Sequence, residues 1–195
     1  MSEIIPLFPL HTVLFPGGPL RLRIFEARYV DMVGRCMREN SPFGVALIVE
    51  GREVGPAKTV TIGTTARIVD FDRLSNGLLG IVARGERRFR IESVEVQPDG
   101  LNVAEVTMLA PEAPTPVPLE LQNLAELMRQ IFPQVTTLYE DVLPRVDDAS
   151  WLSARLAELL PFNLATRQRC LEIDDPVERL QYLNTLIGGA AQARS

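Results

Sequence analysis

The chain has 195 residues, of which 46% are hydrophobic and 23% charged, as in ordinary globular proteins. At about 100–200 residues per domain, this length allows one large domain or two small ones, and it excludes an enzyme that needs several full-sized domains on one chain. The net charge of -5 disfavours binding to the phosphate backbone of nucleic acids, because like charges repel.

The charge is divided unevenly along the chain. Residues 1–110 carry 13 basic and 13 acidic side chains, whereas residues 111–195 carry 7 basic and 12 acidic ones. Four prolines fall within residues 111–118, where they hold the backbone extended and prevent the hydrogen bonds of a sheet. We therefore expect a β domain over 1–110, a semi-rigid Pro-rich linker over 111–118, and a helical domain over 119–195.

The first domain is expected to consist mainly of short strands. One helix is predicted over Glu26–Arg38 from the helical spacing of its apolar residues. Strands are predicted over 43–49, 59–71, 78–83, 89–96 and 101–109, with a break at 84–86. Asn76-Gly77 and Asp99-Gly100 are typical of tight turns between paired strands. This pattern favours a small mixed or antiparallel barrel.

The second domain is expected to be helical, because its apolar residues recur with a period of about 3.6. Helices are predicted from Pro118 to Ile131, from Ser150 to Leu159, from Asn163 to Ile173, and from Asp175 to Gly188-Gly189. Pro133 is expected to kink or end the first of these, although helical spacing resumes over 135–142. Together these segments predict a compact helical bundle.

Few residues offer catalytic chemistry. A hydrolase with a histidine base would need His11, and a Ser–Lys dyad would need Lys58, because the chain contains one histidine and one lysine. Cys36 and Cys170 lie far apart among apolar residues and are expected to be inert packing thiols. Neither a GxxxxGKS/T phosphate-binding loop nor a GxGxxG motif is present. We therefore expect no catalytic residue and no cofactor.

Metal binding is not expected either. Acidic pairs occur at Asp70/Asp72, Asp147/Asp148 and Asp174/Asp175, and adjacent aspartates of this kind are most often turn and cap residues. No CxxC motif or Cys/His cluster accompanies them.

One basic cluster is a candidate for contact with a partner. It contains Arg84, Arg87 and Arg88, followed by Arg90, and it could meet a phosphate or an acidic peptide. Glu86 and the acidic residues after it interleave with these arginines, which is also typical of a solvated strand. We keep Arg84, Arg87 and Arg88 as candidate partner-binding residues.

The N-terminus is not expected to be a targeting signal. It lacks a basic region followed by an apolar stretch, and Pro6, Pro9 and Pro16 interrupt it. No apolar run is long enough to span a membrane. We expect a cytoplasmic protein with free thiols and no membrane partner.

Several segments of the first domain form a distinctive set, which extends to about residue 109. These segments are Ile5–Leu10, Val13–Gly17, Leu22–Tyr29, Phe43–Ile48, Ile62–Thr64, Ala66–Ile68 and Gly85–Ile91. In their order and spacing they resemble the N-terminal domain of Lon, the ATP-dependent protease. The helical part resembles the family more loosely, at Leu156–Pro161 and Arg179-Leu180.

The resemblance implies an α+β fold, in which a PUA-like β pseudo-barrel with one helix precedes an all-α C-terminal helical bundle. It implies a non-catalytic module that recognises unfolded or exposed protein segments, with a separate ATPase or protease as a further possible partner. Lon's ATPase and peptidase modules would follow such a domain, and their motifs are absent from these 195 residues. Within the resemblance, Glu26 and Arg28 are expected to pair, and five residues are expected to fill the barrel core. These are Phe8, Leu10, Phe15, Phe25 and Phe43.

Two alternatives remain open at this point. One is a small hydrolase or peptidase-related enzyme that uses His11, Lys58 or a cysteine. The other is an RNA-binding PUA-like protein that uses the arginines of 84–90, although fold alone does not establish function. The client, the peptide-contacting residues and the oligomeric state are left undetermined by the sequence.

Overall fold

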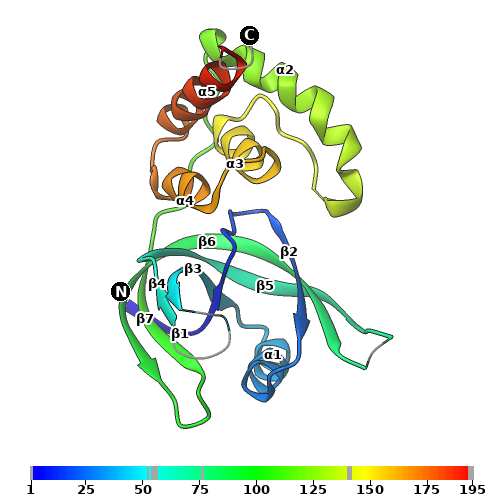
Figure 1. Ribbon diagram of the computed structural model, residues 1–195, viewed down its shortest axis with the longest axis vertical. Helices are drawn as coiled ribbons and strands as arrows, with labels where there is room; N and C mark the ends of the chain where they lie inside the picture. The colour runs from blue at the N-terminus through cyan, green and yellow to red at the C-terminus, as the bar shows by residue number, and fades with distance from the viewer. Residues whose placement is uncertain (1, 52, 54–56, 76, 140–141, 193–195) are drawn as a thin grey trace. The chain divides into compact units, whose positions relative to one another are not determined.

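The computed structural model describes residues 2–51, 53, 57–75, 77–139 and 142–192 (Figure 1). The chain divides into two compact units, Met1–Pro111 and Glu112–Ser195. The first unit contains a sheet and one helix, and the described part of the second contains helices, so the fold mixes α and β structure. Each unit is described by itself.

The first unit contains seven strands and one helix among its described residues. In chain order they are β1 (Ser2–Leu10), β2 (Pro19–Ile24), α1 (Ala27–Glu39), β3 (Phe43–Gly51), β4 (Ala57–Thr59), β5 (Ile62–Arg73), β6 (Leu79–Val96) and β7 (Asn102–Met108). The helix expected over Glu26–Arg38 is confirmed, shifted by one residue because Glu26 takes the N-cap position.

The strand pairings form a ring. The sheet order is β1-β7-β6-β5-β3-β4, and β1 also pairs with β3 in parallel, so the pairings return to the strand where they began. Strand β2 lies off this path and pairs with β6. Residues 79–84 of β6 therefore have β2 on one edge and β5 on the other.

Strand β6 is 18 residues long and continues through the segment where the sequence predicts a break. The irregularity at that place is a bulge: Ala66 faces Gly85, whereas Thr64 faces Arg88. Bulges of this kind bend a strand without ending it. Gly85 is required here because a Cβ atom would lie 2.2 Å from the carbonyl oxygen of Phe15.

The main apolar core of the first unit lies between the sheet and α1. Helix α1 contributes Tyr29, Met32, Val33 and Cys36 to it. Of the five residues expected in the core, four are buried, but Phe25 is 64% exposed, so that prediction is wrong. Phe25 lies between the end of β2 and the start of α1, where neither the strand nor the helix period directs a side chain inward.

The described part of the second unit contains helices. They are α2 (Gln122–Ile131), α3 (Ala149–Leu159), α4 (Leu164–Glu172) and α5 (Pro176–Gln192), with 3-10 turns η1 (Leu119–Leu121), η2 (Phe132–Gln134) and η3 (Thr136–Leu138). Helix α3 is capped by Asp148, not by the expected Ser150, because the Asp148 carboxylate accepts a hydrogen bond from the Ser150 N–H at 3.1 Å. Helix α5 passes through Gly188-Gly189, the expected stop. The helical spacing noted over 135–142 corresponds to the 3-10 turn η3 among the described residues, and 140–141 lie outside them.

The Pro-rich segment is bonded to the second unit from Glu112 onward. The carbonyl of Thr115 accepts a hydrogen bond from the N–H of Ala149 at 2.7 Å. The guanidinium of Arg179, 1% exposed, donates to the carboxylate of Glu112 at 2.5 Å. These contacts distinguish residues 112–118 from a free linker. In neither unit does a described helix combine the length and apolar character needed to cross a membrane.

Candidate functional site

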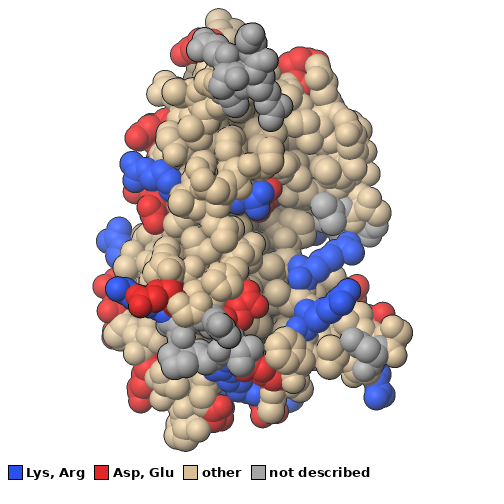
Figure 2. Space-filling view, viewed as in Figure 1, with Lys and Arg blue, Asp and Glu red and all other residues tan. Residues whose placement is uncertain are grey.

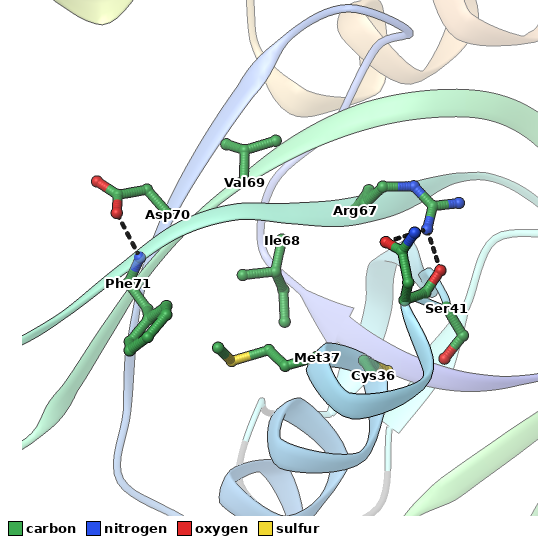
Figure 3. A pocket seen from close by; sticks show the side chains of 9 residues that line it. Cys36, Met37, Ser41, Arg67, Ile68, Val69, Asp70 and Phe71 are labelled. Carbon is green, nitrogen blue, oxygen red and sulfur yellow. Dashed lines mark hydrogen bonds between the residues drawn. The ribbon is translucent and has the colours of Figure 1, made fainter.

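Exposed apolar side chains gather where the end of α1 meets β5. Phe71 is 58% exposed, Val69 52% and Met37 37%. A cavity of about 160 Å³ lies between these two elements, lined on the helix side by Cys36 and Met37 and on the strand side by residues 67–71. Figure 3 shows Ile68 and Phe71 on the same side of β5 as Met37, with Val69 and Asp70 on the other side.

Strand β5 has an open edge at this place. One edge of β5 pairs with β6 over its whole length, whereas the other pairs with β3 only as far as Ala66. Within the described part of the chain, no strand pairs with the second edge beyond that residue. We call the stretch Val69–Arg73 of this second edge the outer edge of β5.

Two aspartates cover the backbone N–H groups of the outer edge. The Phe71 N–H donates to the carboxylate of Asp70 at 2.8 Å, and the Arg73 N–H donates to that of Asp72 at 2.7 Å. Both aspartates lie on β5, so the interpretation of this pair as turn or cap residues is wrong. Carboxylates at a sheet edge discourage indiscriminate pairing with other strands.

On the other side of β5, basic residues of β2 and acidic residues of β5 flank strand β6, which lies between them. Arg21 of β2 and Asp70 of β5 both pair with Val82, and Arg23 and Asp72 both pair with Gly80. These three strands line a second cavity of about 460 Å³. Asp70 and Phe71 line both cavities.

Arg67 fixes the end of α1 against β5. Its guanidinium bonds both oxygens of Glu86, at 2.5 and 3.1 Å, and donates to the backbone carbonyl of Asn40. The hydrogen bond that Arg67 donates to the Glu86 carboxylate raises the pKa of Arg67 above its usual value, so the side chain stays charged. Asn40 ends the helix with φ of +50°, a conformation that asparagine tolerates. The apolar surface beside Met37 is thereby held in place.

The candidate partner-binding arginines do not form one exposed group. Arg88 is 5% exposed, Arg84 is half-buried, and Arg87 is exposed but donates to the carbonyl of Leu109 at 3.3 Å. The bulge at Gly85 explains this arrangement, because it breaks the alternation that would place residues 84 and 88 on the same face. On the face drawn in Figure 2, basic and acidic side chains are interspersed.

The candidate nucleophiles and bases are placed as follows. Cys36 and Cys170 are buried, and burial raises the pKa of Cys36 and that of Cys170, the latter to about 11. Thiols with such raised pKa values carry little of the nucleophilic thiolate at neutral pH. His11 is exposed and its backbone N–H donates to Glu53, while Lys58 is exposed on the short strand β4. Among the described residues, no group of three or more His, Cys, Asp or Glu side chains is placed to hold a metal.

Comparison with protein families identifies the chain over almost its whole length. The family model of the ATP-dependent protease La (LON) substrate-binding domain matches residues 4–188. The chain is also 24% identical over 195 residues to the Lon protease of Cytophaga hutchinsonii. That match covers 95% of this chain but 24% of the relative, so the chain spans about a quarter of the relative's length.

Solved structures agree with this assignment. The Lon N-terminal domain protein from Xanthomonas campestris superposes with a TM-score of 0.81 at 38% sequence identity, covering 94% of this chain and 98% of that one. The N-terminal domain of a Mycobacterium avium complex Lon protease shares the fold, with a TM-score of 0.67 at 24% identity over 93% of this chain and 96% of that one. The chain has mixed α/β structure with a sheet-rich unit like that of the Lon N-domain, and it belongs to the family of the Lon protease substrate-binding domain.

Proposed function

We propose that this chain is a non-catalytic recognition module that binds unfolded or exposed segments of other proteins. The family assignment supports a role in substrate recognition. The proposed binding site is located by the exposed side chains of Phe71 and Met37, which lie on the same side of β5 at its outer edge. Large apolar side chains gathered on a surface are typical of protein interaction sites.

The proposal includes the finer description of the fold. The ring of strand pairings supports a PUA-like pseudo-barrel over 1–110. The helices from Leu119 onward support an all-α helical bundle over 119–195, reached through the Pro-rich segment 111–118. In this description the pseudo-barrel is the rigid support on which α1 and the outer edge of β5 are displayed.

The module would not process its clients itself. Both cysteines are buried, which gives a hydrolase with a cysteine nucleophile little support, and the predicted arginines are not gathered on the surface, which gives an RNA-binding site little support. A client bound here would therefore be passed to a separate ATPase or protease. We propose a cytoplasmic location, where the free thiols of Cys36 and Cys170 remain reduced.

Among the predicted partner-binding arginines, Arg87 is the one we retain. Its side chain is exposed, whereas Arg88 is buried and Arg84 is half-buried. Arg87 would contribute a positive charge at the periphery of the interface, whereas apolar contacts elsewhere would hold the partner. Charges at the periphery of an interface affect association rate more than affinity.

The test is a binding titration with one labelled disulfide-containing protein, used in its folded form and in a form whose disulfides are reduced and whose cysteine thiols are alkylated, so that it cannot refold. We expect the chain to bind the unfolded form and not the folded one. Phe71→Ala should weaken this binding by roughly tenfold, because about 50–60 Å² of apolar contact at ~25 cal/mol per Å² corresponds to such a loss.

Phe25→Ala is the matched control, because Phe25 is similarly exposed, at 64% against 58% for Phe71, but lies at the opposite end of α1 from Met37. It should bind the unfolded protein as the wild type does. Equal affinity of the wild type for the folded and unfolded forms would contradict the proposed function. Equal weakening by both substitutions would contradict the proposed location.

A further inference from the structure

We infer that the outer edge of β5 receives an extended client segment as an added strand, and that it selects a segment in which basic and apolar residues alternate. This inference rests on the proposed function and specifies its substrate class. The occupant is a short stretch of unfolded polypeptide, recognised through its backbone and through two sets of side chains.

The direction of the backbone groups makes the edge suitable for strand addition. The Leu74 N–H donates to the Leu78 carbonyl across the β5–β6 hairpin, so it points toward β6. Backbone groups alternate in direction along a strand, and therefore the N–H and C=O groups of Phe71 and Arg73 point away from β6. Their N–H groups bond the carboxylates of the preceding aspartates, which confirms this direction.

Strand addition at this edge requires an exchange of partners. A carbonyl of the incoming segment takes the N–H of Phe71 or Arg73, and the carboxylate of Asp70 or Asp72 is released from it. A carboxylate released beside a peptide backbone is best stabilised by a positive side chain, through a charge-assisted hydrogen bond. An added strand lies one strand spacing, about 4.8 Å, from Asp70 and Asp72, whereas Arg21 and Arg23 lie two spacings away across β6. The edge therefore favours basic segments over neutral and acidic ones.

The two sides of the strand then determine the alternation. Asp70 lies on one side of β5, and Phe71 lies on the other side with Met37 (Figure 3). Successive side chains of an added strand point to opposite faces of a sheet. A complementary segment therefore places Lys or Arg beside the aspartates and apolar residues beside Phe71 and Met37.

The available length is that of a short strand. Toward its N-terminal end the edge is limited by Arg67, whose guanidinium is bonded to Asn40 at the end of α1. Toward its other end it is limited by the hairpin at Leu74. A bulge between Ile68 and Asp70 interrupts the strand, so the regular part of the edge is Asp70–Arg73. These four residues span about 13 Å at ~3.3 Å per residue, so four or five residues of a client fit.

The experiment measures binding of three labelled eight-residue peptides by fluorescence anisotropy: alternating Lys and Val, alternating Glu and Val, and a block of Lys followed by a block of Val. We expect the alternating Lys–Val peptide to bind at least tenfold more tightly than either of the others. Its affinity should fall as salt is raised from 0.05 to 0.5 M. In hydrogen exchange on the wild-type chain, the Phe71 and Arg73 amides should gain protection when it binds.

Asp70→Asn combined with Asp72→Asn tests the charge, because the amide oxygen still accepts from the neighbouring N–H and the edge keeps its shape. The preference for the Lys–Val peptide over the Glu–Val peptide should fall at least tenfold. The control is Glu92→Gln combined with Glu95→Gln, which removes two carboxylates from exposed positions of β6 and should leave the preference unchanged.

Three results would overturn the inference: equal binding of all three peptides, equal loss of preference in both double variants, or unchanged protection of the two edge amides. Each of these is distinguishable from failure of the proposed function. If unfolded protein still binds and Phe71→Ala still weakens it, recognition stands and only the added-strand mode is wrong. If unfolded protein does not bind the wild type, the proposed function itself fails.

Discussion

Replacing Gly85 by alanine should strongly destabilise the first unit. The added Cβ atom would lie 2.2 Å from the carbonyl oxygen of Phe15, about 1 Å closer than carbon and oxygen tolerate. The contact is with backbone, so it cannot be relieved by rotation of a side chain. The segment Phe15–Gly18 must therefore move away from β6.

That movement affects two buried backbone hydrogen bonds. Gly17 donates to the Gly85 carbonyl at 2.7 Å, and Gly85 donates to the Gly18 carbonyl at 2.9 Å. Loss of each such bond costs about 1–3 kcal/mol when its groups remain buried. The lower entropy of the unfolded chain with alanine returns about 0.4–1 kcal/mol. We expect a net loss of about 1–5 kcal/mol in the free energy of unfolding.

Gly34→Ala is the matched control for this prediction. Gly34 lies in α1, where an added Cβ atom would approach only the end of the Arg38 side chain, at 3.4 Å. Alanine in a helix interior should stabilise by about 0.5–1 kcal/mol. Urea unfolding followed by far-UV circular dichroism measures both variants. A loss below ~1 kcal/mol for Gly85→Ala, or a loss of similar size for Gly34→Ala, would refute the steric argument.

Two further predictions concern the second unit, and Trp151 fluorescence during urea unfolding measures both. Glu112→Ala removes the carboxylate that bonds the buried Arg179 guanidinium and should lower the free energy of unfolding by about 3–5 kcal/mol. The control Glu126→Ala removes an exposed partner of Arg129 and should lower it by less than ~1 kcal/mol. Equal losses in the two variants would contradict the importance of burial. Burial raises the pKa of Cys170 from 9.0 to about 11, so as pH rises the thiol ionises in the unfolded chain before it ionises in the folded one. The contribution of the buried thiol to stability is therefore complete below pH 9 and is lost as pH rises toward 11. Cys170→Ala should make stability fall less steeply over that range, and an unchanged slope would contradict this assignment.

Much of the fold follows from local patterns in the sequence. The spacing of apolar residues in Glu26–Arg38 predicts α1, and Asn163 and Asp175 mark the starts of α4 and α5, because capping depends on a few adjacent residues. Local signals mislead where packing overrides them. Gly188-Gly189 is a plausible helix end, yet α5 continues through it, since in a helix glycine costs only about 1 kcal/mol per residue.

The candidate site is harder to predict because it depends on contacts between distant segments. Alternation of apolar and acidic residues over Val69–Asp72 is compatible with a strand. Whether the edge of that strand is open depends on where pairing with β3 ends, at Ala66, and on the position of the end of α1. Neither the end of that pairing nor the position of α1 can be inferred from the residues near position 70. The arginine cluster fails as an exposed patch for a related reason, because a bulge at Gly85 changes which side chains share a face.

The ring of pairings also has a consequence for biosynthesis. Ser2 near the start of β1 pairs with Thr107 near the end of β7, so β1 leaves the ribosome well before the strand that it must pair with to complete the sheet. Closure therefore occurs late, and contacts so distant in sequence form slowly. A nascent chain that stalls before β7 exposes unpaired edges on both β1 and β6, the kind of edge that promotes aggregation. A module whose clients are proposed to be unfolded proteins thus passes, during its own synthesis, through a state with the same hazard.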